Sequence, residues 1–225
     1  MEKVETILAT MPPPVRVLEA GGGSETRIKI PGASYIVIDI SPEQLERNTY
    51  AAEKLLGDLQ TFDYGTNRFD VALFWDVLEH LRDPSTALIN AAKAVSPGGL
   101  VLVKGPVLRS LKGLTTKVTP HWVHVAYYRI ALKQKNAGKP GYAPFKTEHA
   151  GDADPDAMVR NLEALGLRRE VYEFYITGQI ALLKKNALPI YWIYRAVSMI
   201  VSGLTLGRYG GLESEFILLM RRPAT

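Results

Sequence analysis

The sequence of 225 residues contains no cysteine. Disulfide bonds, thiolate zinc sites and cysteine nucleophiles are therefore excluded, and a reducing compartment such as the cytoplasm suits the chain best. The first residues, MEKVETILATMPPP, also lack the basic start and apolar core of a signal peptide. With 47% hydrophobic and 22% charged residues, the composition is that of an ordinary globular protein, which we expect to form a single domain over residues 1–225.

Acidic residues are missing from one long stretch. From Pro84 to Thr147 there is no Asp or Glu, whereas the same stretch contains ten Lys and Arg residues. Such a region creates a positive potential that attracts an anionic partner. The simpler interpretation is a solvated basic face, and the functional interpretation is a site for an anionic small molecule.

Apolar runs alternate with helical patterns in the first half of the chain. Buried strands are predicted at residues 15–20, 34–39, 69–75 and 100–105. Helices are predicted at residues 41–56, where Ser41 can cap the first turn, and at residues 83–95, which begin with Asp-Pro and end at SPGG. This alternation predicts an α/β fold with a doubly wound, mostly parallel sheet.

The alternation of predicted strands and helices ends after Gly105. We predict an insertion over residues 106–153, built around one helix at about residues 121–135 and the loop NAGKPGYAPF. A helix over DPDAMVRNLEALGL then ends at Gly166, and strands follow at residues 170–176 and 214–220.

An apolar segment at residues 188–206 lies within a second predicted insertion, residues 184–212. The segment is long enough to span a bilayer, but Arg195 near its middle would cost about 2.5–3.5 kcal/mol on insertion. We therefore expect a buried or lid helix, and the alternative is peripheral contact with a membrane surface.

Glycines and acids occupy the ends of three successive elements. The sequence VLEAGGGSE follows the first strand, where glycines allow a sharp turn and close approach of a ligand to the backbone. Asp39 ends the second strand, and an acid there typically binds the ribose hydroxyls of a nucleoside. Asp58 precedes the third predicted strand and is expected near the same edge.

In this order the segments resemble the class I S-adenosylmethionine-dependent methyltransferases over residues 15–105. The resemblance implies a Rossmann-like seven-stranded sheet with an antiparallel C-terminal strand, and S-adenosylmethionine as the cofactor. FDVALFWDVLEHLRDP resembles the family's fourth strand and its continuation. The cofactor-binding residues that the resemblance implies are Glu19, Gly21, Gly23, Asp39, Ile40, Asp58, Leu59 and Trp75.

Two departures from the family pattern follow the first strand. Glu25 replaces the third motif glycine, and the short link SETRIKIPGA predicts that the usual first helix is cut to a turn or two. A nicotinamide cofactor is not favoured instead, because Thr26 stands where the G-x-G-x-x-G pattern needs its last glycine.

The segment PHWVHVAYYR at residues 120–129 admits three interpretations: a core helix, a metal site or the wall of an active site. The chain has no cysteine and no H-E-x-x-H pattern, so no metal is expected, although Mg²⁺ held by distant carboxylates stays open. In a helix, His121 and His124 share a face with Tyr128, and the segment follows a strand whose end should border the ligand pocket. We therefore predict that it lines the acceptor pocket.

The chemistry expected is methyl transfer to a small anionic acceptor such as a nucleotide-linked sugar, a lipid-linked sugar or a nucleoside, in natural-product or glycan biosynthesis. Oxygen is the expected acceptor atom, and an oxygen acceptor needs a base, for which histidine is suited. His121 or His124 is the preferred base, with His80 of LEHL as the next candidate. The residues predicted to bind the acceptor are Trp122, Tyr128, Arg129, Tyr142 and His149.

Two other functions remain as alternatives. The basic stretch and its aromatic residues could serve an RNA methyltransferase, but WDVL stands where an N-P-P-Y motif would be and no RNA-binding module is present. We therefore do not expect a nucleic-acid partner. The other alternative is a regulatory or assembly protein that binds S-adenosylmethionine without catalysis. The sequence leaves the oligomeric state open.

Overall fold

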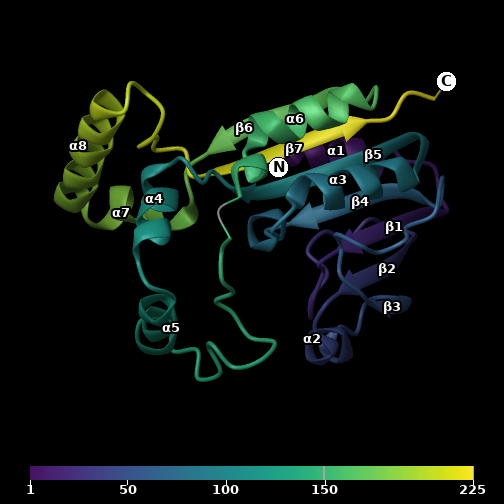
Figure 1. The fold of residues 1–225 in the computed structure, drawn as a ribbon, viewed down its shortest axis with the longest axis horizontal. Helices are drawn as coiled ribbons and strands as arrows, with labels where there is room; N and C mark the ends of the chain where they lie inside the picture. The colour runs from purple at the N-terminus through teal and green to yellow at the C-terminus, as the bar shows by residue number, and fades with distance from the viewer. Residues whose placement is uncertain (149, 225) are drawn as a thin grey trace.

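The structure is a computed structural model that describes residues 1–148 and 150–224. Its centre is a seven-stranded sheet of order β3-β2-β1-β4-β5-β7-β6 (Figure 1). The strands β1 to β5 pair in parallel, and β7 lies antiparallel between β5 and β6. The predicted Rossmann-like sheet with an antiparallel C-terminal strand is thereby confirmed. The strands are β1 Val15–Ala20, β2 Ala33–Asp39, β3 Glu53–Leu56, β4 Phe69–Trp75, β5 Val95–Pro106, β6 Arg168–Tyr175 and β7 Glu215–Arg221.

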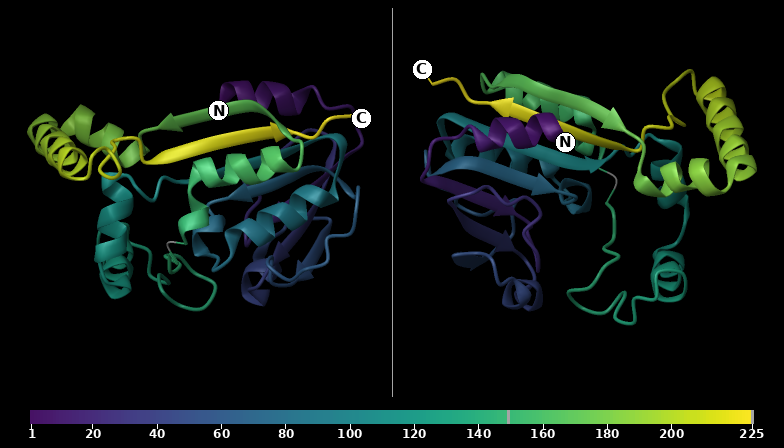
Figure 2. Two further views of the ribbon diagram at one scale, coloured as in Figure 1. Left: turned by 45° about the horizontal axis from the view of Figure 1, so that its top comes forward. Right: turned by 180° about the vertical axis from the view of Figure 1, so that it is seen from behind.

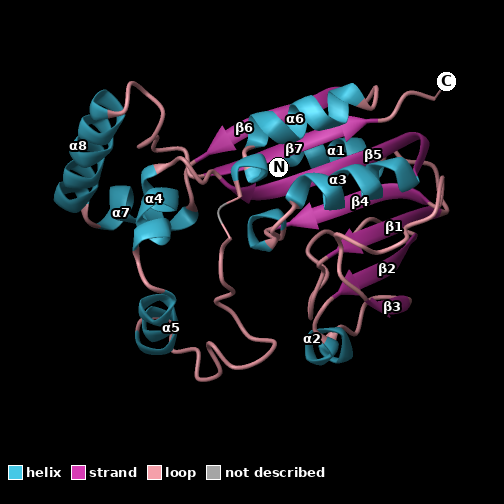
Figure 3. Ribbon diagram, viewed as in Figure 1, coloured by secondary structure: helices cyan, strands magenta, loops and turns pink. Residues whose placement is uncertain are grey.

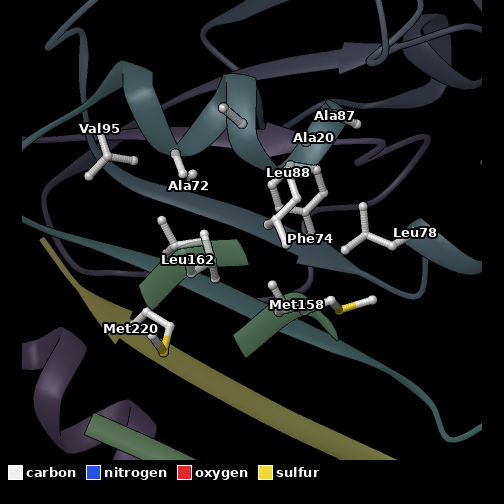
Figure 4. Packing of buried hydrophobic residues seen from close by; sticks show 14 of the residues in the cluster. Ala20, Ala72, Phe74, Leu78, Ala87, Leu88, Val95, Met158, Leu162 and Met220 are labelled. Carbon is white, nitrogen blue, oxygen red and sulfur yellow. The ribbon is translucent and has the colours of Figure 1, made fainter. Parts of the chain in front are cut away.

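Helices cover the two faces of the sheet unequally (Figure 2). α3 (Pro84–Ala94) and α6 (Pro155–Ala164) pack on one face, where Phe74, Leu88 and Leu162 form part of a large core (Figure 4). The other face is covered by α1 (Glu2–Ala9), whose Val4 and Leu8 join a second core with strands β1, β2, β4, β5, β6 and β7. The sequence had predicted α3 and α6 but not α1.

No helix occurs between β1 and β2, so the expected turn or two of helix is wrong. The link crosses the sheet as an extended chain that buries Ile28 and Ile30. It is fixed by Tyr35, whose hydroxyl donates to the Ile28 carbonyl and accepts from the Ile30 amide. With these apolar side chains in place, α1 and the link together cover a face that a helix would otherwise fill.

The helix predicted over residues 41–56 is divided into α2 (Pro42–Arg47) and the edge strand β3. The N-terminal cap is as expected, because the Ser41 side chain accepts from the Gln44 amide. The helix ends at Asn48, which is fully buried and whose side chain accepts from the amides of Tyr50 and Ala51. That side chain competes with further helix, and the chain continues as a strand.

The helices of residues 111–130 and 178–204 lie beyond the carboxyl ends of the parallel strands and cover neither face of the sheet (Figure 3). The first two form an arm, α4 (Leu111–Val118) and α5 (His121–Ile130), from which residues 131–148 return to the sheet as a loop. The helix expected at residues 121–135 ends earlier than predicted, and α4 was not predicted. We call residues 111–130 the arm and residues 131–148 the return loop.

The other two helices form a hairpin, α7 (Gly178–Asn186) and α8 (Leu188–Leu204), between β6 and β7. Only two residues of α8, Tyr191 and Ser198, are buried, so the buried-helix interpretation of this segment is wrong. No helix in the described part of the chain is long and apolar enough to cross a membrane. The remaining short elements are η1 (Leu78–His80) and η2 (Gly151–Ala153).

Because α1 replaces the missing crossover helix, its core contacts should be essential for stability. We expect Leu8→Ala to lower the free energy of unfolding by about 2–5 kcal/mol, since Leu8 is 2% exposed in the second core. The matched variant Leu165→Ala, at a position that is 36% exposed, should cost about 0.5 kcal/mol or less. Urea unfolding followed by circular dichroism measures both. Equal unfolding midpoints for the two variants would contradict this role of α1.

Candidate active site

A cleft of about 730 Å³ opens at the carboxyl ends of β1, β4 and β5. Ligands of open α/β sheets bind at this edge, because the loops that follow parallel strands converge there. The turn after β1 and η1 after β4 form one side of the cleft. The arm and residues 143–147 of the return loop form the other side.

The carboxyl end of β1 brings a buried carboxylate to the cleft. Glu19 Oε1 accepts from the Arg27 amide at 3.1 Å, while Oε2 is buried without a hydrogen-bond partner among the described residues. Burial raises the pKa of Glu19, and the Arg27 amide partly opposes this. Gly21 and Gly23 both have positive φ, and a Cβ at Gly21 would lie 2.6 Å from Val77. An unpartnered acceptor beside a glycine turn fits a ligand that carries a hydrogen-bond donor.

The second acid, Asp39, lies next to this turn. Its Oδ1 accepts from the Ser41 amide at 2.8 Å. Burial raises the pKa of Asp39, and hydrogen bonds from the amides of Ser41, Gly23 and Ile40 offset part of this increase. The Gly57 amide donates to the Asp39 carbonyl at 3.0 Å, which brings Asp58 to the same end of the sheet. Asp39, Asp58 and the exposed Ile40 do not line the cleft itself but continue its edge beyond Gly23.

Leu59 and Trp75 complete the predicted cofactor residues. Leu59 is buried in the first core, and its carbonyl accepts from the Tyr64 hydroxyl at 2.9 Å, so its side chain serves packing. Trp75 ends β4 and lines the cleft. The residues present therefore fit an S-adenosyl group, with Glu19 and the glycine turn at one end and Asp39 and Asp58 at the other.

His80 is held firmly at the inner wall of the cleft. Its Nδ1 lies 2.7 Å from the Lys146 carbonyl oxygen, which can only accept, so Nδ1 carries the proton. Burial lowers the pKa of His80 below its usual range near 6.5, so the ring is neutral at pH 7 and Nε2 has a lone pair. This is the protonation state that a general base requires.

Glu79, next to His80, is a buried acid that the sequence reasoning did not single out. It lines the cleft and is nearly inaccessible to solvent. Burial, reinforced by the nearby Asp76 carboxylate, raises the pKa of Glu79 to about 8. Glu79 is therefore mostly protonated at pH 7, and it adds little negative charge beside His80, whose Nε2 lies 3.8 Å from Glu79 Oε1.

Lys104 is the buried cation of the cleft, and its charge is balanced locally. Its Nζ lies 2.7 and 2.8 Å from the two carboxylate oxygens of Asp76 and 3.2 Å from Glu215 Oε2. Asp76 has a φ of 53°, an uncommon conformation for a residue other than glycine and one found at functional sites. A carboxylate that lines the cleft, has an uncommon backbone conformation and pairs with a buried lysine indicates a functional site. The sequence alone does not reveal this pairing.

The arm presents one side of α5 to the cleft. His121, His124 and Tyr128, which share a face of the helix, line the cleft. His124 Nε2 is buried and has no hydrogen-bond partner among the described residues, which leaves a donor or acceptor for a ligand. No residue of α5 is buried, so the core-helix interpretation of PHWVHVAYYR is wrong.

The return loop joins the arm to both ends of the cleft. Arg47 of α2 donates to the Gly141 carbonyl, and its guanidinium lies 4.3 Å from the ring centroid of Tyr142. Farther on, the Glu148 amide donates to the Glu79 carbonyl at 2.9 Å, and Phe145 packs edge-to-face on His80. The loop thus passes from the nucleoside end of the cleft to η1.

Three residues predicted to bind the acceptor do not line the cleft. Trp122 is 71% exposed on the opposite side of α5, Arg129 donates to the Ala137 carbonyl, and Tyr142 lies against Arg47. His149 lies outside the described residues. Within residues 1–148 and 150–224, no group of three or more His, Cys, Asp and Glu side chains is placed to hold a metal ion.

The family model for the methyltransferase domain matches residues 1–166 of this sequence. The chain belongs to the methyltransferase family. Membership implies S-adenosylmethionine as the cofactor, in agreement with the glycine turn and the acids that follow β1 and β2. The solved structure of an S-adenosylmethionine-dependent methyltransferase from Methanosarcina mazei has the same fold, with a TM-score of 0.55 and 14% identity over 98% of both chains.

Two curated methyltransferases match parts of the sequence. The ubiquinone biosynthesis O-methyltransferase of Caulobacter sp. (strain K31) is 41% identical over 63 residues, which are 28% of this chain and 22% of that protein. The tRNA 5-carboxymethoxyuridine methyltransferase of Escherichia coli (strain K12) is 32% identical over 114 residues, 44% of either protein. This methyltransferase chain thus spans less than half the length of either relative.

If Glu19 Oε2 receives a hydrogen bond from the cofactor, Glu19→Gln should weaken cofactor binding without lowering the free energy of unfolding. We expect the affinity for S-adenosylmethionine to fall about tenfold or more, as for a lost hydrogen bond to a charged group. Stability at pH 7 should stay the same or rise, because burial disfavours the charged form of Glu19 and the amide has no charge.

Isothermal calorimetry and thermal unfolding measure the two quantities, with the exposed Asp63→Asn as the control for a carboxylate-to-amide change. Unchanged cofactor affinity in Glu19→Gln would show that the cofactor does not use this carboxylate.

Proposed function

We propose that this chain transfers the methyl group of S-adenosylmethionine to a hydroxyl oxygen of a small anionic acceptor, with His80 as the general base. The observation that carries the proposal is the hydrogen bond from His80 Nδ1 to the Lys146 carbonyl, which leaves the Nε2 lone pair in the cleft. S-adenosylmethionine, when bound, supplies an electrophilic methyl group on a sulfonium. The chain then has to hold the acceptor in line and take up its proton.

His80 suits this task better than the two histidines of α5. Its position on η1 follows β4 directly, and η1 is fixed to the sheet, whereas α5 lies on an arm apart from the sheet (Figure 1). Its proton is already on Nδ1, so Nε2 would be free to accept the hydroxyl proton of an acceptor held in line with the sulfonium methyl, whose bond to sulfur would break to leave a neutral thioether. Neutral Glu79 beside it keeps the pKa of His80 from rising.

The residues of α5 then serve acceptor recognition rather than proton transfer. His124 Nε2 is buried and unpartnered, and Tyr128 shares its side of the helix. Lys117 also lines the cleft, and no carboxylate of the described residues lies within ion-pair distance of it. These groups support an acceptor with an anionic part, such as the phosphate of a nucleotide-linked or lipid-linked sugar.

An oxygen acceptor is also supported by the printed name of the Caulobacter relative, which is an O-methyltransferase. RNA is the second candidate acceptor, because the Escherichia coli relative is named as a tRNA methyltransferase. The two acceptors differ in salt dependence, since RNA binding through many phosphates weakens steeply as salt rises.

The general proposal is tested by incubating the protein with methyl-labelled S-adenosylmethionine and separated fractions of host metabolites, lipids and RNA. We expect label in a small-molecule or lipid fraction, as a methyl ether that resists mild base treatment and that mass spectrometry locates. Label confined to the RNA fraction would replace the small acceptor by RNA. Cofactor binding without label in any fraction would instead favour a non-catalytic role.

His80→Asn tests the base, because the asparagine amide can still donate to the Lys146 carbonyl but cannot take a proton. With the labelled fraction as acceptor, we expect turnover to fall about 10²- to 10⁴-fold at unchanged cofactor affinity. In the parent protein, turnover should persist below pH 6.5, because burial lowers the pKa of His80 and protonation abolishes the base only below that pKa.

The comparison variant is His121→Asn, which should raise the KM for the acceptor and keep most of kcat, because α5 serves recognition and not proton transfer. Full turnover in His80→Asn together with loss in His124→Asn would transfer the role of base to α5.

A further inference from the structure

α8 has its polar and apolar sides reversed relative to a helix that packs on a core. Its outward side carries large apolar side chains and no charged one, while its inward side contains Tyr191, Arg195 and Ser198. Ser198 is buried, and its hydroxyl donates to the Gly210 carbonyl. The outward apolar residues are Leu188, Ile190, Trp192, Ile193, Val197, Met199, Ile200 and Leu204.

The helix projects from the end of the molecule, far from the two cores of the sheet (Figure 2). It packs on α7, which adds Leu182 to the exposed apolar residues, and Leu206 follows the end of α8 in the same exposed state. A continuous apolar surface of this kind on an outer helix marks an interaction site, because scattered single residues are the ordinary case.

The charge around this surface indicates which partner it fits. Residues 176–212 contain Lys184, Lys185, Arg195 and Arg208 and no acidic residue. The guanidinium of Arg195 lies 5.2 Å from the ring centroid of Trp192, at the border of the apolar side. A helix with an apolar face, tryptophan and flanking cations is the type that lies in the plane of a membrane interface and is attracted by anionic lipids.

We propose that the α7–α8 hairpin binds peripherally to an anionic lipid bilayer, with the outward side of α8 inserted at the level of the headgroups. A second copy of the chain fits the surface less well, because the only charges of residues 176–212 are positive, so two copies that meet here would repel each other. The proposal does not depend on methyl transfer, since neither the cofactor cleft nor His80 takes part in it.

The hairpin also borders the cleft. Gln179 of α7 lines it together with Lys112 and Lys117 of the arm. Through α7, the hairpin therefore connects the exposed apolar side of α8 to one border of the cleft.

The test is flotation of the full chain, without cofactor, with vesicles of phosphatidylcholine and phosphatidylglycerol in equal parts. Vesicles of phosphatidylcholine alone serve as the comparison. We expect binding to the anionic vesicles that weakens with salt, and a blue shift of tryptophan fluorescence that disappears in Trp192→Phe. The other tryptophans, Trp75 and Trp122, remain in that variant and report nonspecific effects.

The decisive variant is Ile193→Asp combined with Ile200→Asp, at positions that are 64% and 60% exposed and thus tolerate charge without unfolding. We expect the partition onto anionic vesicles to fall about tenfold or more. Leu165→Asp, at an exposed position near the start of β6 and thus at the opposite end of that strand from the hairpin, should bind as the parent does. Thermal unfolding confirms that all variants are folded.

Three results would overturn the proposal. They are no association with anionic vesicles, equal association of the double aspartate variant, and a stable dimer in lipid-free solution that the double variant dissociates. The last result would assign the surface to a second copy of the chain. None of these results bears on methyl transfer, which is measured separately with labelled cofactor.

Discussion

The turn that follows β1 is the constraint on which the site depends. Three hydrogen bonds fix this turn. The Gly21 amide donates to the Ile38 carbonyl at 2.7 Å, and Asn48 Nδ2 donates to the Gly23 carbonyl at 3.2 Å. The third bond runs from the Arg27 amide to the Glu19 carboxylate. The same Asn48 ends α2, before the edge strand β3 begins at Glu53. Because these bonds hold the turn, the chain can omit the helix that would otherwise follow β1 and still keep a rigid glycine turn at the cleft.

Sequence patterns were sufficient where one local signal determined one element. The apolar runs of β1, β2, β4 and β5 and the Asp-Pro cap of α3 gave the parallel sheet, and the glycine turn with its acids gave the family. β3 was missed because its side chains are mostly exposed at the sheet edge, so no apolar run marks it. α1 was missed because its role, covering a face left open by a missing helix, is set by tertiary packing and not by local sequence.

The chemical environment was still less accessible to sequence. LEHL pointed to His80, but the tautomer depends on a carbonyl 66 residues later in the chain. Glu79 appears in the sequence as an ordinary acid, and only burial beside Asp76 makes it a neutral group at pH 7. For the same reason Trp122 and Arg129 looked like acceptor ligands on a helix that in fact turns them away from the cleft. Side-chain roles of this kind follow from the three-dimensional contacts.

The acid-free stretch also acquires a different meaning from the structure. Lys104, at the centre of the cleft, is neutralised by Asp76 and Glu215, so the positive potential does not act at the place where His80 lies. On the arm, Lys117 lines the cleft and has no carboxylate of the described residues within ion-pair distance. This division suits the proposed reaction, in which a neutral hydroxyl would lose its proton to neutral His80, because an unbalanced cation beside the base would lower the pKa of His80 further and weaken it as a base. In that proposal the charged part of the acceptor would bind at the mouth, where water and the basic residues would stabilise it, while the reacting oxygen would lie beside His80.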